Sequence, residues 1–116
     1  MEILVHTDSK ITARPDLERH VREALESRLA RYDQRLTRVD VWFNEENSRS
    51  AGVPELRCTV EARPAGKDPV AVTADAMELG LAFDGALDKL AALLRTRFGK
   101  EQQHKGAPSI RTTPAD

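Results

Sequence analysis

Arginines recur at steps of three or four residues in one segment of the chain, as Arg28, Arg31, Arg35 and Arg38. Side chains at this spacing share one face of an α-helix, so we expect a row of guanidinium groups. Such a row repels itself unless a polyanion neutralises it, and each planar guanidinium matches the oxygens of a phosphate. The alternative is an ordinary solvated helix face with ion pairs four residues apart. Few acids lie at the pairing positions, so we favour binding to an RNA backbone.

A second group of basic residues lies near the C-terminal end of the chain. Glu101 is the one acid among five cations, which are Lys89, Arg95, Arg97, Lys100 and Lys105. Basic side chains near the end of a helix also complement its dipole, but that effect explains only one or two of them. We therefore predict a binding surface to which both basic groups contribute.

The charge of the whole chain hides an uneven distribution. The formal net charge is -1 and the pI is about 6.3, whereas many nucleic-acid-binding domains exceed a pI of about 9. Residues 14–39 carry seven arginines against five acids, and residues 89–116 carry six basic residues against two acids. Residues 40–88 carry four basic residues against ten acids. The middle of the chain is therefore acidic, and the two predicted helices have basic ends.

Two carboxylates, Asp84 and Asp88, lie four residues apart on the polar face of a predicted helix. Paired carboxylates can serve acid–base chemistry or bind a metal, so a small hydrolase or metal enzyme is one hypothesis. No third ligand accompanies them in the sequence. We therefore interpret them as solvated acids that tune or limit phosphate contact.

The other reactive residue types form no catalytic pattern. Cys58 alternates in phase with Leu56 and Val60, so we expect a small buried side chain and not a nucleophile. The histidines are scattered without the spacing of metal ligands. The sequence also has no glycine-rich phosphate loop and no nucleotide-binding fingerprint. We therefore expect no enzyme activity, no cofactor, no metal and no small-molecule substrate.

A long amphipathic helix is predicted from Pro15 to Leu36. Proline suits the first turn of a helix, because its missing N–H would have no partner there. The apolar residues recur every three or four positions, as Leu17, Val21, Leu25, Leu29, Tyr32 and Leu36. We expect this stripe to pack on the core and to place the arginine row at its flank.

A second amphipathic helix is predicted from Asp75 to Phe98. Asp75 and Glu78 match a capping box, whose two side chains accept hydrogen bonds from free backbone N–H groups at the start of a helix. The apolar stripe of this helix comprises Leu79, Phe83, Leu87, Leu90 and Leu94. Asp84 and Asp88 fall on the opposite side, so one face is expected in the core and the other in water.

Strands are predicted by the alternation of apolar and polar residues, over residues 2–6, 39–44, 56–63 and 70–74. A loop is expected at 47–54 and a tight turn at 64–69, where turn-forming residues gather. Trp42 alternates out of phase with Val41 and Phe43, which places it on the open face of the sheet. There it could stack on a base or a partner side chain, or pack against a neighbouring strand.

The element order β-α-β-β-β-α predicts an α+β fold. Three consecutive strands form an antiparallel meander, and the first strand joins them after a helical crossover. Each helix has one apolar stripe, which gives a two-layer sandwich of a four-stranded sheet with two helices on one face. We expect a single domain over residues 1–100 and a flexible tail over residues 101–116. One cysteine and the lack of a long apolar run favour a cytoplasmic protein without a membrane segment.

The run from Phe83 to Leu90 resembles the last helix of the ribosome hibernation-promoting factor and ribosome-associated inhibitor family. It shows an aromatic residue, Asp, two spacers, an aliphatic residue and then Asp-Lys-Leu. The segment from Arg28 to Leu36 is similar to the C-terminal end of that family's first helix, with a basic–aliphatic pair on each side of Tyr32. The predicted element order is also the family's, and the chain resembles its short form.

The resemblance implies a ribosome-binding translation inhibitor of the bacterial stress response, with the small ribosomal subunit and its rRNA as partners. Members of the family occupy the channel for messenger and transfer RNA and stabilise idle ribosomes. The implied RNA-binding residues are Arg28, Arg35 and Lys89, to which geometry adds Arg31, Arg95 and Arg97. The alternative is a protein-interaction or stress-regulatory module of the same fold without tight RNA binding, acting through the sheet face around Trp42, Arg57 and Arg63. Weak self-association of the chain is left open.

Overall fold

The computed structural model describes residues 1–9, 11, 14–46 and 55–106, without the side chains of residues 100–106. Over these residues the elements follow the predicted order β-α-β-β-β-α, with a short 3-10 turn added after the first helix. They are β1 (Glu2–Thr7), α1 (Pro15–Arg28), the 3-10 turn η1 (Ala30–Tyr32), β2 (Leu36–Glu46), β3 (Glu55–Pro64), β4 (Val70–Ala76) and α2 (Leu79–Gly106). The predicted α+β fold is confirmed.

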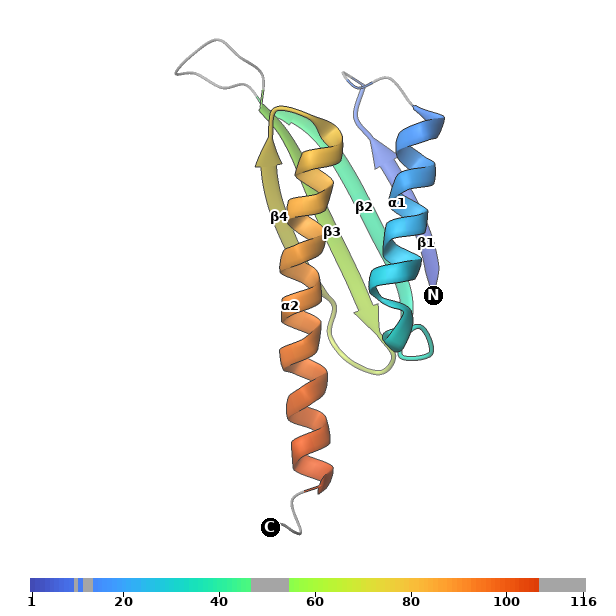
Figure 1. Cartoon of the computed structure of the whole chain (residues 1–116), viewed down its shortest axis with the longest axis vertical. Helices are drawn as coiled ribbons and strands as arrows, with labels where there is room; N and C mark the ends of the chain where they lie inside the picture. Colours follow the sequence, from blue (N-terminus) through green and yellow to red (C-terminus); the bar gives the residue numbers. More distant parts are fainter. Residues whose placement is uncertain (10, 12–13, 47–54, 107–116) are drawn as a thin grey trace.

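Within the described residues, the strands form one four-stranded sheet in the order β1-β2-β3-β4. β1 pairs in parallel with β2, whereas β2, β3 and β4 form an antiparallel meander. Both helices cover the same face of the sheet (Figure 1), as their single apolar stripes predict. The turn between β3 and β4 contains Gly66 at a φ of 72°, a conformation that the Cβ of other residues disfavours.

The core lies between the sheet and the two helices. On the sheet, its fully buried members include Val39, Val41, Phe43, Cys58 and Val60. On the helices, its buried members include Leu17, Val21, Leu25, Leu79, Phe83, Leu87, Leu90, Leu94 and Phe98. Gly85 allows α2 to approach the sheet closely, because a Cβ at this position would lie 3.2 Å from the Cβ of Ala74. Both predicted apolar stripes are therefore core.

The open face of the sheet carries side chains that pack and pair with one another. Trp42 stacks on His6 of the adjacent strand, with ring centroids 5.1 Å apart, so cross-strand packing is the alternative that the structure supports. Asp40 is buried on this face, where Arg38 Nε and His6 Nε2 lie 2.8 and 3.0 Å from its carboxylate oxygens. Burial alone would raise the pKa of Asp40, but the hydrogen bonds with Arg38 and His6 outweigh burial and lower that pKa.

The first helix is shorter than predicted. α1 ends at Arg28, and Leu29, Tyr32 and Leu36 are buried beyond it, in the turn and at the start of β2. A helix of 14 residues is about 21 Å long. That length already matches the 6 residues of β1, which span about 20 Å. The chain must then turn into β2, and a 3-10 turn preserves an apolar spacing of three residues. The predicted helix to Leu36 is therefore wrong beyond Arg28.

The start of the second helix also differs from the prediction. Asp75 does not cap α2, because it belongs to β4 and faces Arg57 across the β3–β4 ladder. Arg57 Nε and Nη2 donate to its carboxylate oxygens at 2.8 and 3.2 Å, and these bonds lower the pKa of Asp75. The helix begins at Leu79, where Ala82 N donates to Glu78 O at 3.0 Å. Cross-strand pairing of the acid therefore prevails over capping.

The far end of α2 extends beyond the predicted limit at Phe98. The helix continues to Gly106, so residues 101–106 of the expected tail are helical. Glu, Gln and Lys are good helix formers, and the polar sequence carries no helix breaker before Gly106. The remaining part of the expected tail, residues 107–116, and the expected loop at 47–54 lie outside the described residues. The flexible tail therefore stays a prediction.

Candidate nucleic-acid interface

Three of the predicted RNA-binding arginines converge on one hollow between η1 and the middle of α2. Arg31 comes from η1, Arg35 from the turn that follows it, and Arg95 from α2. The hollow has a volume of about 360 Å³. Its lining residues are Arg31, Tyr32, Arg35, Arg95, Phe98 and Gly99. We call Arg31, Arg35 and Arg95 the arginine cluster.

The backbone around the turn holds Arg35 in place. Its N–H donates to Tyr32 O at 2.8 Å, and its carbonyl accepts from Ala65 N at 2.9 Å. The Arg35 guanidinium carbon lies 3.9 Å from the centroid of the Phe98 ring, a close cation–π contact. Tyr32 packs on the same ring, with centroids 4.9 Å apart. Two aromatic rings therefore form a floor that orients a cation at the mouth of the hollow.

Two members of the cluster, Arg31 and Arg95, carry positive charge that no described carboxylate neutralises in an ion pair. Arg31 and Arg95 are exposed, and neither forms an ion pair with any residue that the structure describes. The Arg31 guanidinium carbon lies 6.0 Å from the centroid of the Tyr32 ring. Among the described lining residues there is no carboxylate. Guanidinium groups arranged in this way can bind phosphate oxygens with paired hydrogen bonds.

Arg28 lies close to the seam between the two helices and is already paired. Its Nη1 donates to Asp88 Oδ1 at 3.0 Å, with both side chains exposed. One turn earlier on α2, Asp84 Oδ1 lies 3.1 Å from His20 Nε2 of α1. Asp84 and Asp88 are both solvent-exposed, as predicted, and each of them links α2 to a side chain of α1. A phosphate that approaches Arg28 must compete with Asp88.

The other predicted residues do not join the cluster. Lys89 lies on the flank of α2 that faces β4, where its Nζ donates to the Thr73 carbonyl at 2.7 Å. Arg97 is half-buried and does not line the hollow. Arg38 belongs to β2 and pairs with Asp40 on the open sheet face. Because α1 ends at Arg28, the four arginines of the sequence pattern do not form one helical row.

The aromatic floor of the hollow was not among the predicted site residues. The sequence pattern places Tyr32 in the apolar stripe of the first helix, and Phe98 marks the expected end of the second helix. The spacing of Phe98 four residues after Leu94 indicates burial, and that signal alone does not distinguish a core residue from the floor of a binding hollow. Contact between η1 and α2 gives Phe98 its second role.

Among the described residues, the cysteine is buried and the candidate metal ligands are not grouped. Cys58 is fully buried, and burial raises the pKa of its thiol to about 12, so it is not a thiolate at neutral pH. Among the described residues, no three His, Cys, Asp or Glu side chains are grouped so that they could hold a metal. None of the described helices combines the length and the apolar character that crossing a membrane requires.

The solved structures that share the fold include two that match most of this chain. A ribosomal subunit interface protein from Coxiella burnetii is 16% identical with a TM-score of 0.63, and the match covers 85% of this chain and 99% of that one. The N-terminal domain of Protein Y from Thermus thermophilus is 20% identical with a TM-score of 0.57, and the match covers 84% of this chain and 99% of that one. No curated protein matches this chain significantly in sequence.

A sequence model of one protein family also matches. It is described as "Sigma 54 modulation protein / S30EA ribosomal protein" and matches residues 4–102. Since this match spans most of the chain, the protein belongs to the Sigma 54 modulation protein / S30EA ribosomal protein family, the ribosome-associated hibernation factors that its sequence resembles.

Proposed function

We propose that this protein binds the small ribosomal subunit in the channel for messenger and transfer RNA, inhibits translation and stabilises idle ribosomes. Its family supports an association with ribosomes. The observation that carries the finer statement is the arginine cluster, in which two segments far apart in sequence present three guanidinium groups around one hollow. Such a partner also implies the cytoplasm. The protein acts by occupying a site and not by catalysis.

In this proposal, the arginine cluster binds phosphates of the small-subunit rRNA. The aromatic floor holds the Arg35 guanidinium in place, so less side-chain freedom is lost on binding. Arg31 and Arg95 supply donors from the two walls of the hollow. Arg28 joins them when a phosphate replaces Asp88 as its partner.

The open face of the sheet is a weaker candidate for RNA binding, because its cations are paired. Arg57 donates to Asp75, Arg63 to Glu61 and Arg38 to Asp40. A phosphate would have to displace a carboxylate at each of these positions, whereas Arg31 and Arg95 form no ion pair with a described residue. The face therefore offers a matched control, because it carries arginines of similar exposure outside the proposed interface.

Co-sedimentation with purified small subunits tests the proposal. We expect the full chain to pellet with them and its apparent affinity to fall steeply with salt, by a log–log slope of about 0.7 to 0.9 per phosphate contact. Changing Arg31→Glu with Arg95→Glu should abolish most of the binding. The control, Arg57→Glu with Arg63→Glu, should retain it. If the control loses binding and the cluster variant keeps it, the interaction-module function replaces this one.

The position in the channel needs a separate measurement. Small subunits preloaded with messenger and transfer RNA should bind the protein much more weakly than empty subunits. Translation of a reporter in a purified system should fall with added wild-type protein and not with the cluster variant. Equal binding to empty and preloaded subunits would contradict the channel position while leaving ribosome association intact.

A further inference from the structure

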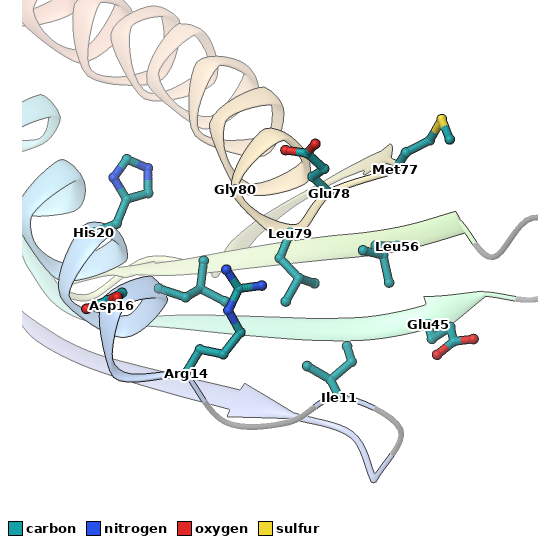
Figure 2. Close-up of a pocket in the computed structure, with 11 residues that line it drawn as sticks. Ile11, Arg14, Asp16, His20, Glu45, Leu56, Met77, Glu78, Leu79 and Gly80 are labelled. Atoms are coloured by element: carbon teal, nitrogen blue, oxygen red, sulfur yellow. The ribbon is translucent and has the colours of Figure 1, made fainter.

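A groove with an apolar floor lies at the other end of the helix pair, where both α1 and α2 begin. Its volume is about 640 Å³. Figure 2 shows Leu56 of β3, Leu79 of α2 and Ile11 around its floor, and the Arg14 side chain reaching toward it from the start of α1. Ile11 and Leu56 are partly exposed, so the floor is accessible to solvent. An aliphatic side chain of a partner would find apolar surface there.

The apolar surface continues from the groove to its rim. Among the described residues, the exposed large hydrophobic side chains are Met77, at 71%, and Leu81, at 58%. Met77 lines the groove, and Leu81 lies in the first turn of α2. Single exposed apolar side chains are ordinary, but Met77 lines the same groove as the accessible apolar floor. An exposed apolar side chain beside such a floor indicates an interaction surface.

Carboxylates stand on two sides of the floor. Glu45 of β2 and Glu78, which precedes α2, line the groove from different elements (Figure 2), and neither forms an ion pair with another described side chain. Asp16 also lines it, but Arg19 Nη2 lies 2.6 Å from its carboxylate. Arg14 is the guanidinium in the lining. Charge complementarity therefore favours a basic ligand, and the two glutamates would repel a phosphate backbone.

We propose that this groove binds a segment of another protein that carries an aliphatic side chain flanked by lysine or arginine. The aliphatic side chain occupies the floor between Leu56 and Leu79, and the basic side chains pair with Glu45 and Glu78. This is a second site. α1 has 14 residues and separates the groove from the arginine cluster by about 21 Å, so both can be occupied at once.

Gly80 provides a way to fill the groove without disturbing the core. It lines the groove in the first turn of α2, and a Cβ added there would have no atom within 4 Å. A large side chain at this position has open space beside it, and alanine at the same position changes little. Gly80→Trp and Gly80→Ala therefore form a matched pair that separates occlusion of the groove from substitution of the glycine.

The test uses the full chain and a short fluorescein-labelled peptide with a central pair of leucines flanked by lysines, followed by fluorescence anisotropy. We expect saturable binding that is lost when the leucines are changed to serine or the lysines to glutamate. Gly80→Trp should weaken peptide binding by roughly tenfold or more, whereas Gly80→Ala should leave peptide binding unchanged. Thermal melting of each variant confirms that it is folded.

The charge requirement is tested with a second matched pair. Glu45→Gln with Glu78→Gln should weaken peptide binding by about fivefold to tenfold. Glu23→Gln with Glu26→Gln removes the same charge from the exposed side of α1, and should have little effect. The proposal is overturned if the serine peptide binds as well as the leucine peptide, if Gly80→Trp binds like Gly80→Ala, or if both glutamine pairs act alike. Binding of Arg31→Glu with Arg95→Glu to the peptide should match wild type.

Discussion

The two ends of the helix pair share one scaffold and carry opposite chemistry. At the start of α1 and α2, two glutamates without an ion pair to any described side chain lie beside an accessible apolar floor. Beyond the end of α1, arginines surround a hollow whose floor is aromatic. The difference shows that the near-neutral net charge of -1 results from two local excesses of opposite sign. Net charge is therefore a poor guide to the partners of this protein, because a partner meets the local field.

We expect the largest loss of stability and binding when the Phe98 ring is removed from the aromatic floor of the arginine cluster. Phe98 is 4% exposed, and Phe98→Ala should lower the free energy of unfolding by about 3 kcal/mol. It should also weaken binding to small subunits, because Arg35 loses the ring that orients it. Denaturant unfolding and co-sedimentation measure the two effects.

Leu17 at the groove end supplies the control for that change. Leu17→Ala should cost about 2 to 3 kcal/mol of stability, since Leu17 is 8% exposed. It should leave affinity for small subunits unchanged in conditions where the variant is folded. If the two variants lose binding equally, stability and not the aromatic floor explains the loss.

A smaller effect distinguishes the predicted arginines and lysines from one another. Arg95→Gln should reduce the log–log salt slope of small-subunit binding by about 0.7 to 0.9, as for the loss of one phosphate contact. Lys89→Gln should reduce it less, because Lys89 faces β4 and bonds the Thr73 carbonyl. Glu78→Gln at the groove end should leave the slope unchanged. A larger change for Lys89 than for Arg95 would move the interface to the other flank of α2.

Releasing Arg28 from its ion pair with Asp88 should strengthen binding to small subunits, in contrast to the losses expected above. Asp88→Asn removes the carboxylate that holds the Arg28 guanidinium at 3.0 Å. We expect affinity for small subunits to rise by roughly threefold, with a change in stability below about 1 kcal/mol, because both side chains are exposed. Glu18→Gln, which frees the exposed Arg22 far from the cluster, is the matched control. Weaker binding of Asp88→Asn would show that the acid supports the interface.

The smallest expected effect compares two glycines of α2. Gly99 lies inside the helix at the cluster end and Gly80 in its first turn at the groove end, and a Cβ at either position meets no atom within 4 Å. Gly99→Ala should raise stability by about 0.5 to 1 kcal/mol, because alanine loses less conformational freedom than glycine in the interior of a helix. Gly80→Ala should raise it by less, because the ends of a helix fray and restrict the backbone less. Thermal melting measures both. A loss of stability in Gly99→Ala would show that the hollow cannot accept a methyl group.

Most of the architecture follows from local patterns. Alternation along the strands, the apolar stripes of the helices and the single free face of the sheet predict the two-layer sandwich that the structure has. The errors lie where a local pattern fits two structures. The spacing of Leu29, Tyr32 and Leu36 suits a helix as well as a turn that leads into a strand, and the length of the sheet selects the turn. Asp75 suits a cap as well as a cross-strand pair, and Arg57 in the adjacent strand selects the pair.

The sequence by itself determined the element order, the core residues, the buried thiol and the presence of basic segments at two places in the chain. Each of these features follows either from the periodicity of residues close in sequence or from the general tendency of apolar residue types to be buried. Only the tertiary structure decided which cations meet. Arg31, Arg35 and Arg95 gather because η1 packs against the middle of α2, whereas Lys89 faces a different strand. Contact between distant segments depends on where each element ends, and the end of α1 depends on where the chain must turn into β2.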